Sequence, residues 1–275
     1  MSSSDAPAAP EGLSFELPGG GRALFTTRAD GNLSSVGGLD HERGLQARER
    51  LRDRLGLSVL ARGYQVHGTF IRCIREPADL PAHADTDAAQ PPIEADGHAT
   101  SIAGVGVMAL GADCLPVALG GAGAVAMVHA GWRGLAAGVL EEGVLALRAL
   151  GVEGEIAAIV GPGAGHCCYE VGPEVHAAFG GVGAAGAAGT TGTTGAGGAG
   201  APADDSHVRT GGAAEACGTP IDLRAIVRSR LRAAGVLDVR DAHMCTICDE
   251  RFYSHRREGA DAGRNGGVAW LNPSP

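Results

Sequence analysis

Residues 102–150 read IAGVGVMALGADCLPVALGGAGAVAMVHAGWRGLAAGVLEEGVLALRAL, and this stretch decides the fold. Its first part contains three apolar runs of strand length, at 102–110, 115–119 and 124–129. Runs that are apolar throughout are typical of strands buried inside a sheet. Its second part, 135–150, repeats apolar residues close to the helical period and predicts a helix packed on that sheet, although each of its two glycines costs about 1 kcal/mol relative to alanine.

Strands and helices alternate on both sides of this stretch. Further strands are predicted at 13–17, 22–27, 63–74, 155–160 and 267–271, and further helices at 40–55, 172–179 and 221–234. Because helices interleave with strands of mixed length, the pattern favours the α/β or mixed α+β class. We expect a single domain with a mixed central sheet flanked by helices.

Two segments are expected to lie outside the packed part of the chain. Residues 1–12 are rich in Ser, Ala and Pro and predict a flexible tail. Residues 180–204 consist almost wholly of Gly, Ala and Thr, a composition that buries too little side chain to offset the entropy of ordering it. We therefore expect a domain over 13–275 that carries a low-complexity insertion at 180–204.

The composition argues against several classes of protein. Lys and Arg number 22 against 31 Asp and Glu, a formal charge of −9, so no basic surface for nucleic acid is expected. The first ten residues lack the basic start and apolar run of a signal peptide, and Gly, Asp or Pro interrupts the longest apolar stretches. No membrane span is predicted. The seven cysteines are odd in number and unevenly spaced, which favours thiols or metal ligands in a cytoplasmic protein over a disulfide framework.

Three segments combine reactive residues with predicted strands: QVHG at 65–68, ADCLPV at 112–117 and VHAGWRG at 128–134. In the second and third, Cys114 and His129 stand where an apolar strand meets a glycine-containing loop, a common position for functional residues. With His67, they supply two imidazoles and one thiolate, which suits Zn²⁺ and leaves a fourth position open. Because the three residues are far apart in the sequence, spacing alone leaves open a core cysteine and two hydrogen-bonded histidines.

These segments, in this order, closely resemble the laccase-domain proteins, which are described both as multicopper polyphenol oxidases and as purine nucleoside phosphorylases. The resemblance continues in GPGAGHCCYEVG at 161–172, in FYSHRREG at 252–259 and in Thr26-Thr27-Arg28. It covers roughly 13–271 apart from the insertion, although the segment after Arg28 departs from the family's pattern. The resemblance implies that His67, Cys114 and His129 bind zinc; one Cys and two His also accept copper.

The same resemblance implies an enzyme that acts on purine nucleosides with phosphate. Its reactions would be phosphorolysis of adenosine, inosine and methylthioadenosine to free base and ribose 1-phosphate, and deamination of adenosine. On this hypothesis Arg28 or Arg133 holds phosphate, because charged guanidinium groups bind phosphate oxygens well. Asp113 or Asp96 would orient the neighbouring groups. The preferred nucleoside and the oligomeric state stay open.

Other functions remain possible at this point. A copper-dependent polyphenol oxidase would need many more histidine ligands than the two in the matched motifs. A peptidoglycan editing role, acting on cell-wall precursors, has been given to members of the family, and a binding protein that merely retains the metal fold is a further alternative.

The CxxC at Cys245 and Cys248 suggests a redox pair or half a zinc site, but no second CxxC accompanies it. The adjacent Cys167 and Cys168 are expected to serve packing or loop structure.

Overall fold

The computed structural model describes residues 12–34, 40–80, 93–180 and 218–272. The predicted tail and insertion lie outside these residues except for Gly12 and Gly180, so the domain limits stay predictions. Within the described residues, no helix is both long and apolar enough to cross a membrane.

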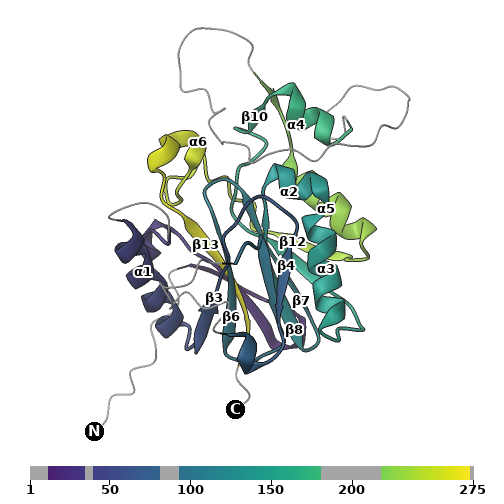
Figure 1. The fold of residues 1–275 in the computed structure, drawn as a ribbon. Helices are drawn as coiled ribbons and strands as arrows, with labels where there is room; N and C mark the ends of the chain where they lie inside the picture. Colours follow the sequence, from purple (N-terminus) through teal and green to yellow (C-terminus); the bar gives the residue numbers. More distant parts are fainter. Residues whose placement is uncertain (1–11, 35–39, 81–92, 181–217, 273–275) are drawn as a thin grey trace.

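Most strands belong to two mixed sheets (Figure 1). The five-stranded sheet contains, in spatial order, β1 (Leu13–Glu16), β2 (Gly21–Phe25), β13 (Asn265–Leu271), β6 (Val105–Gly111) and β3 (Val59–Ala61). The six-stranded sheet contains β12 (Asp238–Asp241), β9 (Ala157–Val160), β7 (Leu115–Gly121), β8 (Ala124–Ala130), β5 (Gly97–Thr100) and β4 (Ile71–Ile74). A two-stranded sheet pairs β10 (Glu170–Val171) with β11 (Thr219–Pro220).

The α-helices of the described residues are α1 (Asp40–Arg54), α2 (Trp132–Ala137), α3 (Val139–Ala149), α4 (Pro173–Ala178), α5 (Leu223–Ala233) and α6 (His255–Glu258). Short 3₁₀ turns occur at Pro18–Gly20, Arg28–Asp30, Pro77–Asp79 and Gly259–Asp261. The mixed α/β class and the single domain predicted from the sequence are confirmed. The strands, however, divide between two large sheets instead of forming one central sheet.

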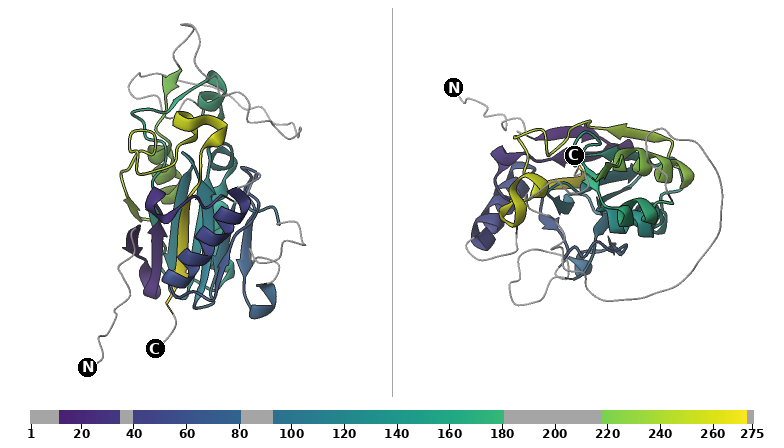
Figure 2. Two further views of the ribbon diagram at one scale, coloured as in Figure 1. Left: turned by 90° about the vertical axis from the view of Figure 1, so that its left-hand side faces the viewer. Right: turned by 90° about the horizontal axis from the view of Figure 1, so that it is seen from above.

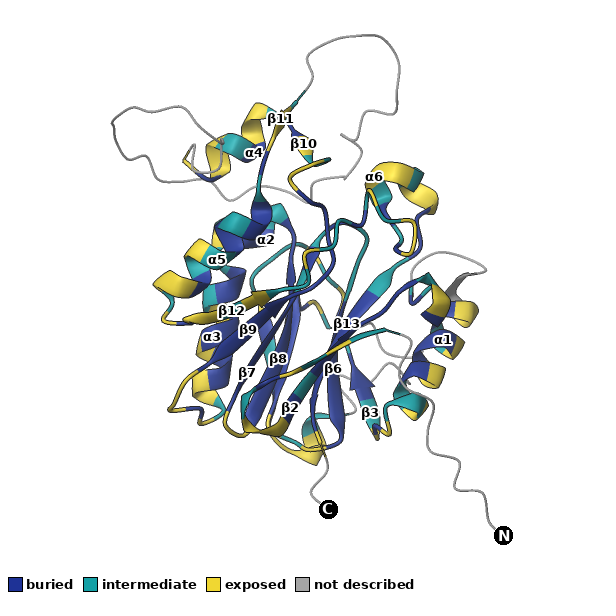
Figure 3. Cartoon of the chain, turned by 180° about the vertical axis from the view of Figure 1, so that it is seen from behind, coloured by how far each residue is buried: buried dark blue, intermediate teal, exposed yellow. Residues whose placement is uncertain are grey.

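The two large sheets lie face to face, and helices cover their outer faces, which gives four layers (Figures 1 and 2). Phe25 and Met127 belong to the apolar cluster between the sheets. Leu51 of α1 packs on the outer face of the five-stranded sheet, and Leu140 of α3 and Val227 of α5 pack on the six-stranded sheet. The central strands are therefore buried on both faces, and the exposed residues lie on the outer sides of the helices, in the loops and in edge strands such as β12 (Figure 3). This burial explains why the runs at 102–129 are apolar throughout and do not alternate.

Two predicted elements differ from the structure. The strand predicted at 63–74 is wrong over most of its length, because only Ile71–Ile74 forms a strand and His67 lies in a loop. The helix predicted at 135–150 is divided into α2 and α3 at Gly138, which has a φ of 104° and ends the first helix in the left-handed region.

Candidate metal centre

Strand register brings the three candidate ligands to one edge of the six-stranded sheet. In the β7–β8 hairpin, Leu115 pairs with Ala130, so Cys114 and His129 lie at the same end. Gly97 at the start of β5 pairs with Val128 of β8, which places Asp96 beside His129. β4 runs parallel to β5 and starts at the same end of the sheet. The loop that carries His67 leads into β4, so His67 also lies at that end.

The ligand atoms of His67, Cys114 and His129 all lie within 4.8 Å of one another. The sulfur of Cys114 is 3.8 Å from Nε2 of His67, and the two imidazole rings are 4.9 Å apart between centroids, at an angle of 67°. Gly131 leaves no space to spare, since a Cβ at this position would lie 2.6 Å from Cδ2 of His67 and 3.2 Å from the Cys114 sulfur. The structure thus brings together the three residues that the sequence singled out.

Asp96 holds the His67 loop and the His129 ring in position by accepting hydrogen bonds from both. Its buried carboxylate accepts the backbone N–H groups of Val66, His67 and Gly68 at 3.1, 2.9 and 2.7 Å. It also accepts Nδ1–H of His129 at 2.9 Å, which leaves Nε2 of that ring for a metal ion. The backbone of His67 has a φ of 60°, a left-handed conformation that a non-glycine residue rarely adopts. The three backbone hydrogen bonds that Asp96 accepts hold that conformation in place.

The same contacts set the charges of the centre. Burial raises the pKa of the Cys114 thiol, but the His129 and His67 imidazoles outweigh it and lower this pKa to about 6. Burial lowers the pKa of His129, whereas the Cys114 thiolate and the Asp96 carboxylate raise it to about 9. The two shifts favour a thiolate on Cys114 and a proton on His129, and a metal ion that binds through Nε2 would displace that proton.

Asp113 fixes the peptide that carries Cys114. Its φ is 89°, and its buried carboxylate accepts hydrogen bonds from the hydroxyls of Thr246 and Ser254, at 2.6 and 3.1 Å, and from the backbone N–H of Arg256 at 2.7 Å. Its carbonyl accepts the N–H of Ala164 at 2.7 Å. Both carboxylate oxygens are occupied, so the contacts of Asp113 suit a residue that holds the centre in position.

The two arginines predicted to bind phosphate are engaged differently. The guanidinium of Arg28 donates to the carbonyl of Phe252 at 3.0 Å, forms an ion pair with Glu258 and lies 4.3 Å from the ring centroid of Tyr253. The guanidinium of Arg133 lies over the ring of Trp132, 4.5 Å from its centroid. Arg28 is thus tied to the C-terminal motif whose neighbouring residues hold Asp113.

Tyr169 is a residue near the centre that the sequence reasoning did not single out. Burial raises its pKa, the charge of Cys114 raises it further, and the guanidinium of Arg256 lowers it. Arg256 lies over the Tyr169 ring at 5.3 Å and donates to the carbonyl of Glu170 at 2.8 Å. The signal was present, because Tyr169 follows the two cysteines of the 161–172 motif.

Known proteins resemble this chain over nearly its whole length. A purine nucleoside phosphorylase of Xylella fastidiosa is 35% identical, over 92% of this chain and 88% of that protein. A purine nucleoside phosphorylase of Corynebacterium glutamicum is 33% identical, over 91% and 94%.

Solved structures show the same fold. The YlmD protein of Geobacillus stearothermophilus matches with a TM-score of 0.73 and 26% identity, over 92% of this chain and 93% of that one. A protein of Neisseria meningitidis matches with a TM-score of 0.71 and 26% identity, over 96% and 100%. A family model described as multi-copper polyphenol oxidoreductase laccase matches residues 22–272. The chain therefore belongs to the multi-copper polyphenol oxidoreductase laccase family.

Proposed function

We propose that this protein is a zinc-dependent purine nucleoside phosphorylase that also deaminates adenosine. One observation carries the proposal: His67, Cys114 and His129 converge at a sheet edge, and Asp96 accepts Nδ1–H of His129, so that Nε2 is the nitrogen that would bind a metal ion. The relatives named purine nucleoside phosphorylase, similar over nine-tenths of the chain, supply the substrate class. The free thiols of the described residues suit a cytoplasmic location, where cysteines stay reduced.

The donor set favours zinc at a single site over a multicopper oxidase. Two imidazoles and one thiolate form a three-ligand site of the kind that catalytic zinc occupies, with the fourth position left for water or substrate. Among the described residues, this is the one group of three or more close metal-ligating side chains that contains histidine. Several coppers would need further histidines close by. When bound, zinc would supply a Lewis acid and would activate water for attack on a purine carbon.

The residues around the centre support the two reactions in different ways. In phosphorolysis, a phosphate oxygen bonds to C1′ of the ribose while the bond to the purine nitrogen breaks, and the departing base takes up a proton. Phosphate needs cationic donors, for which Arg28 and Arg133 are the candidates. In deamination, water adds to the purine and ammonia leaves, so no phosphate donor is required. Asp96 and Asp113 hold His67, His129 and the Cys114 peptide, and they take no proton in this scheme.

The test is turnover of inosine and adenosine by zinc-loaded protein with and without inorganic phosphate. We expect hypoxanthine release from inosine to require phosphate and to yield ribose 1-phosphate, whereas adenosine should be deaminated without phosphate. Release of hypoxanthine at the full rate in phosphate-free buffer would make the enzyme a hydrolase and would refute the proposal.

Replacing Arg28 with Ala should reduce phosphorolysis more than deamination. Loss of a charge-assisted hydrogen bond costs roughly 1.5–3 kcal/mol, which is about ten- to a hundredfold in rate if the bond acts in the transition state. Both reactions are measured on the same preparation. Because Glu258 pairs with Arg28, Glu258→Gln serves as the companion variant that keeps the guanidinium and removes its partner. Equal losses of both reactions in the Ala variant would show that Arg28 holds the structure and does not select phosphate.

A further inference from the structure

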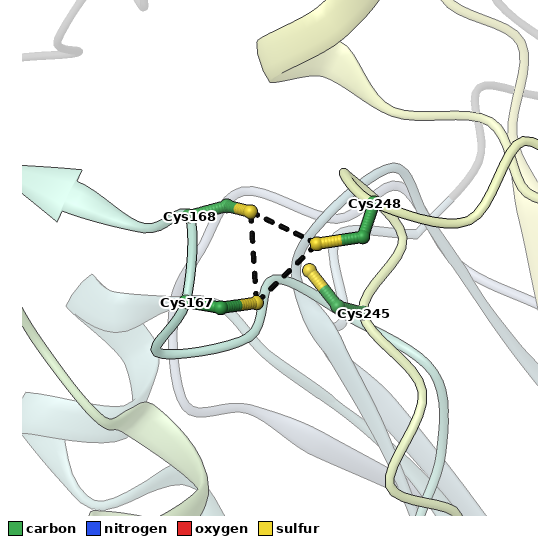
Figure 4. A group of neighbouring side chains, drawn as sticks. All are labelled: Cys167, Cys168, Cys245 and Cys248. Atoms are coloured by element: carbon green, nitrogen blue, oxygen red, sulfur yellow. Dashed lines mark hydrogen bonds between the residues drawn. The ribbon is translucent and has the colours of Figure 1, made fainter.

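Four cysteines from two distant segments meet outside the centre described above (Figure 4). Cys167 and Cys168 lie in the loop after β9, and Cys245 and Cys248 lie in the loop after β12. These strands are parallel neighbours, with Val160 paired to Asp241, so their loops leave the sheet side by side. The loops stay in contact further on, because Gly163 exchanges backbone hydrogen bonds with Met244 and Thr246 at 3.2 and 3.1 Å.

The four sulfur atoms form one compact group. Cys248 is 3.0 Å from Cys168 and 3.4 Å from Cys167, Cys167 is 3.5 Å from Cys168, and all four sulfurs lie within 4.8 Å of one another. All are free thiols, and a disulfide would bring two sulfurs to about 2.05 Å. Two thiolates on a tetrahedral zinc ion, each at about 2.3 Å from the metal, are about 3.8 Å apart. A single ion would therefore fit with small outward rotations of the side chains.

Burial and local contacts distinguish this group from ordinary core cysteines. Cys167 and Cys248 are exposed and Cys168 and Cys245 are half-buried, so the packing role expected for the adjacent pair does not account for them. The backbone N–H of Gly165 donates to the Cys245 sulfur at 3.2 Å. Amides that surround the first sulfur of a CxxC loop stabilise the thiolate that a metal requires.

We propose that Cys167, Cys168, Cys245 and Cys248 bind one zinc ion in a closed tetrathiolate site. The site is independent of the proposed function, and with four protein ligands it leaves no open position for substrate, as in structural zinc sites. Its place in the fold gives it a structural task. The two loops that it joins also supply Ala164 and Thr246, which hold Asp113 next to Cys114. The ion would fasten together the segments that support the first centre.

The test uses the full-length protein purified under reducing conditions, with zinc measured by mass spectrometry. We expect one ion for each of the two groups in the unaltered protein. Cys248→Ser and Cys168→Ser should each lose one equivalent, and Cys114→Ala should lose the other. Cys73→Ser is the matched control, because Cys73 is a half-buried thiol in β4 outside both groups, and it should lose none. A zinc content in the Cys248 and Cys168 variants equal to that of the unaltered protein would overturn the proposal.

Cobalt substitution gives a second readout that does not depend on how well the serine variants fold. In the Cys114→Ala protein, Co²⁺ should produce the intense visible bands and the sulfur-to-metal charge transfer of a tetrathiolate complex. Because this protein lacks a ligand of the first centre, the result is separate from any failure of the nucleoside chemistry. Absence of those bands, or a spectrum with fewer than four thiolates, would contradict the assignment, as would a disulfide among the four cysteines in protein kept reduced.

Discussion

Replacing Cys114 with Ala should abolish zinc binding at the first centre and should reduce phosphorolysis and deamination together. Cys114 supplies the sulfur ligand of the centre, and the two imidazoles lower the pKa of its thiol. Loss of a partner in the outer shell of a metal site typically costs 10–100-fold, so removal of a ligand itself should cost more than about a hundredfold in both rates. The measurement is the initial rate of inosine phosphorolysis and of adenosine deamination, with metal content determined on the same sample.

Cys73→Ala is the control for removing a thiol from the same sheet. Cys73 lies in β4, and burial raises the pKa of its thiol, so it is a neutral side chain at physiological pH. This variant should retain both activities. If Cys114→Ala lost phosphorolysis but kept deamination at the original rate, the two reactions would not share a metal centre, and the proposed enzyme would need a second site for one of them.

The strands around Cys114 and His129 were predictable because strands that are buried on both faces have an apolar composition. Every residue of β8 is buried, and β7 is buried except at Pro116, so apart from His129 these strands consist of apolar and small residues without alternation. Two glycine-containing turns delimit them. The hairpin that they form places Cys114 and His129 at one end for any register close to the observed one. Two of the three candidate ligands could therefore be brought together from the sequence.

The loop of His67 could not be predicted in the same way, because its conformation depends on a residue far along the chain. The N–H groups of residues 66–68 bond to the carboxylate of Asp96 and not to a neighbouring strand. The local sequence from 63 to 74 shows only a loose alternation of apolar and polar residues, which predicts a strand. Nothing within that window shows that a buried carboxylate, 29 residues beyond His67, provides the acceptors.

Only half of the four-cysteine group could be predicted from the sequence, for a related reason. The spacing of Cys245 and Cys248 is a recognisable half-site, but its partners lie about 80 residues earlier. They meet because β12 adds to the sheet parallel to β9. β12 has the sequence DVRD, which is partly exposed at a sheet edge and lacks the apolar run that marks the central strands. Without that strand, the sequence offers no reason to place the two loops side by side.

Replacing Asp96 with Asn should weaken zinc binding at the first centre about 10–100-fold and should also destabilise the protein before any metal binds. The carboxylate accepts four hydrogen bonds, three from the 66–68 loop and one from the His129 ring. An amide of the same shape has one oxygen to accept with, and its NH₂ group would face N–H donors. At least one buried donor is then left unsatisfied, at a cost of about 1–3 kcal/mol, and the charge-assisted hydrogen bond that orients the His129 ring is lost.

Two measurements separate these effects: chelator competition for zinc affinity, and denaturant unfolding of the metal-free protein. Asp79→Asn is the matched control, since the Asp79 carboxylate also accepts backbone N–H groups, from Arg75 and Glu76, but in an exposed setting. Its unfolding free energy should change by well under the 1–3 kcal/mol expected for a buried donor. If Asp96→Asn lowered stability and left zinc affinity unchanged, Asp96 would serve the fold of the loop alone. His129 would then need another hydrogen bond to present Nε2 to the metal.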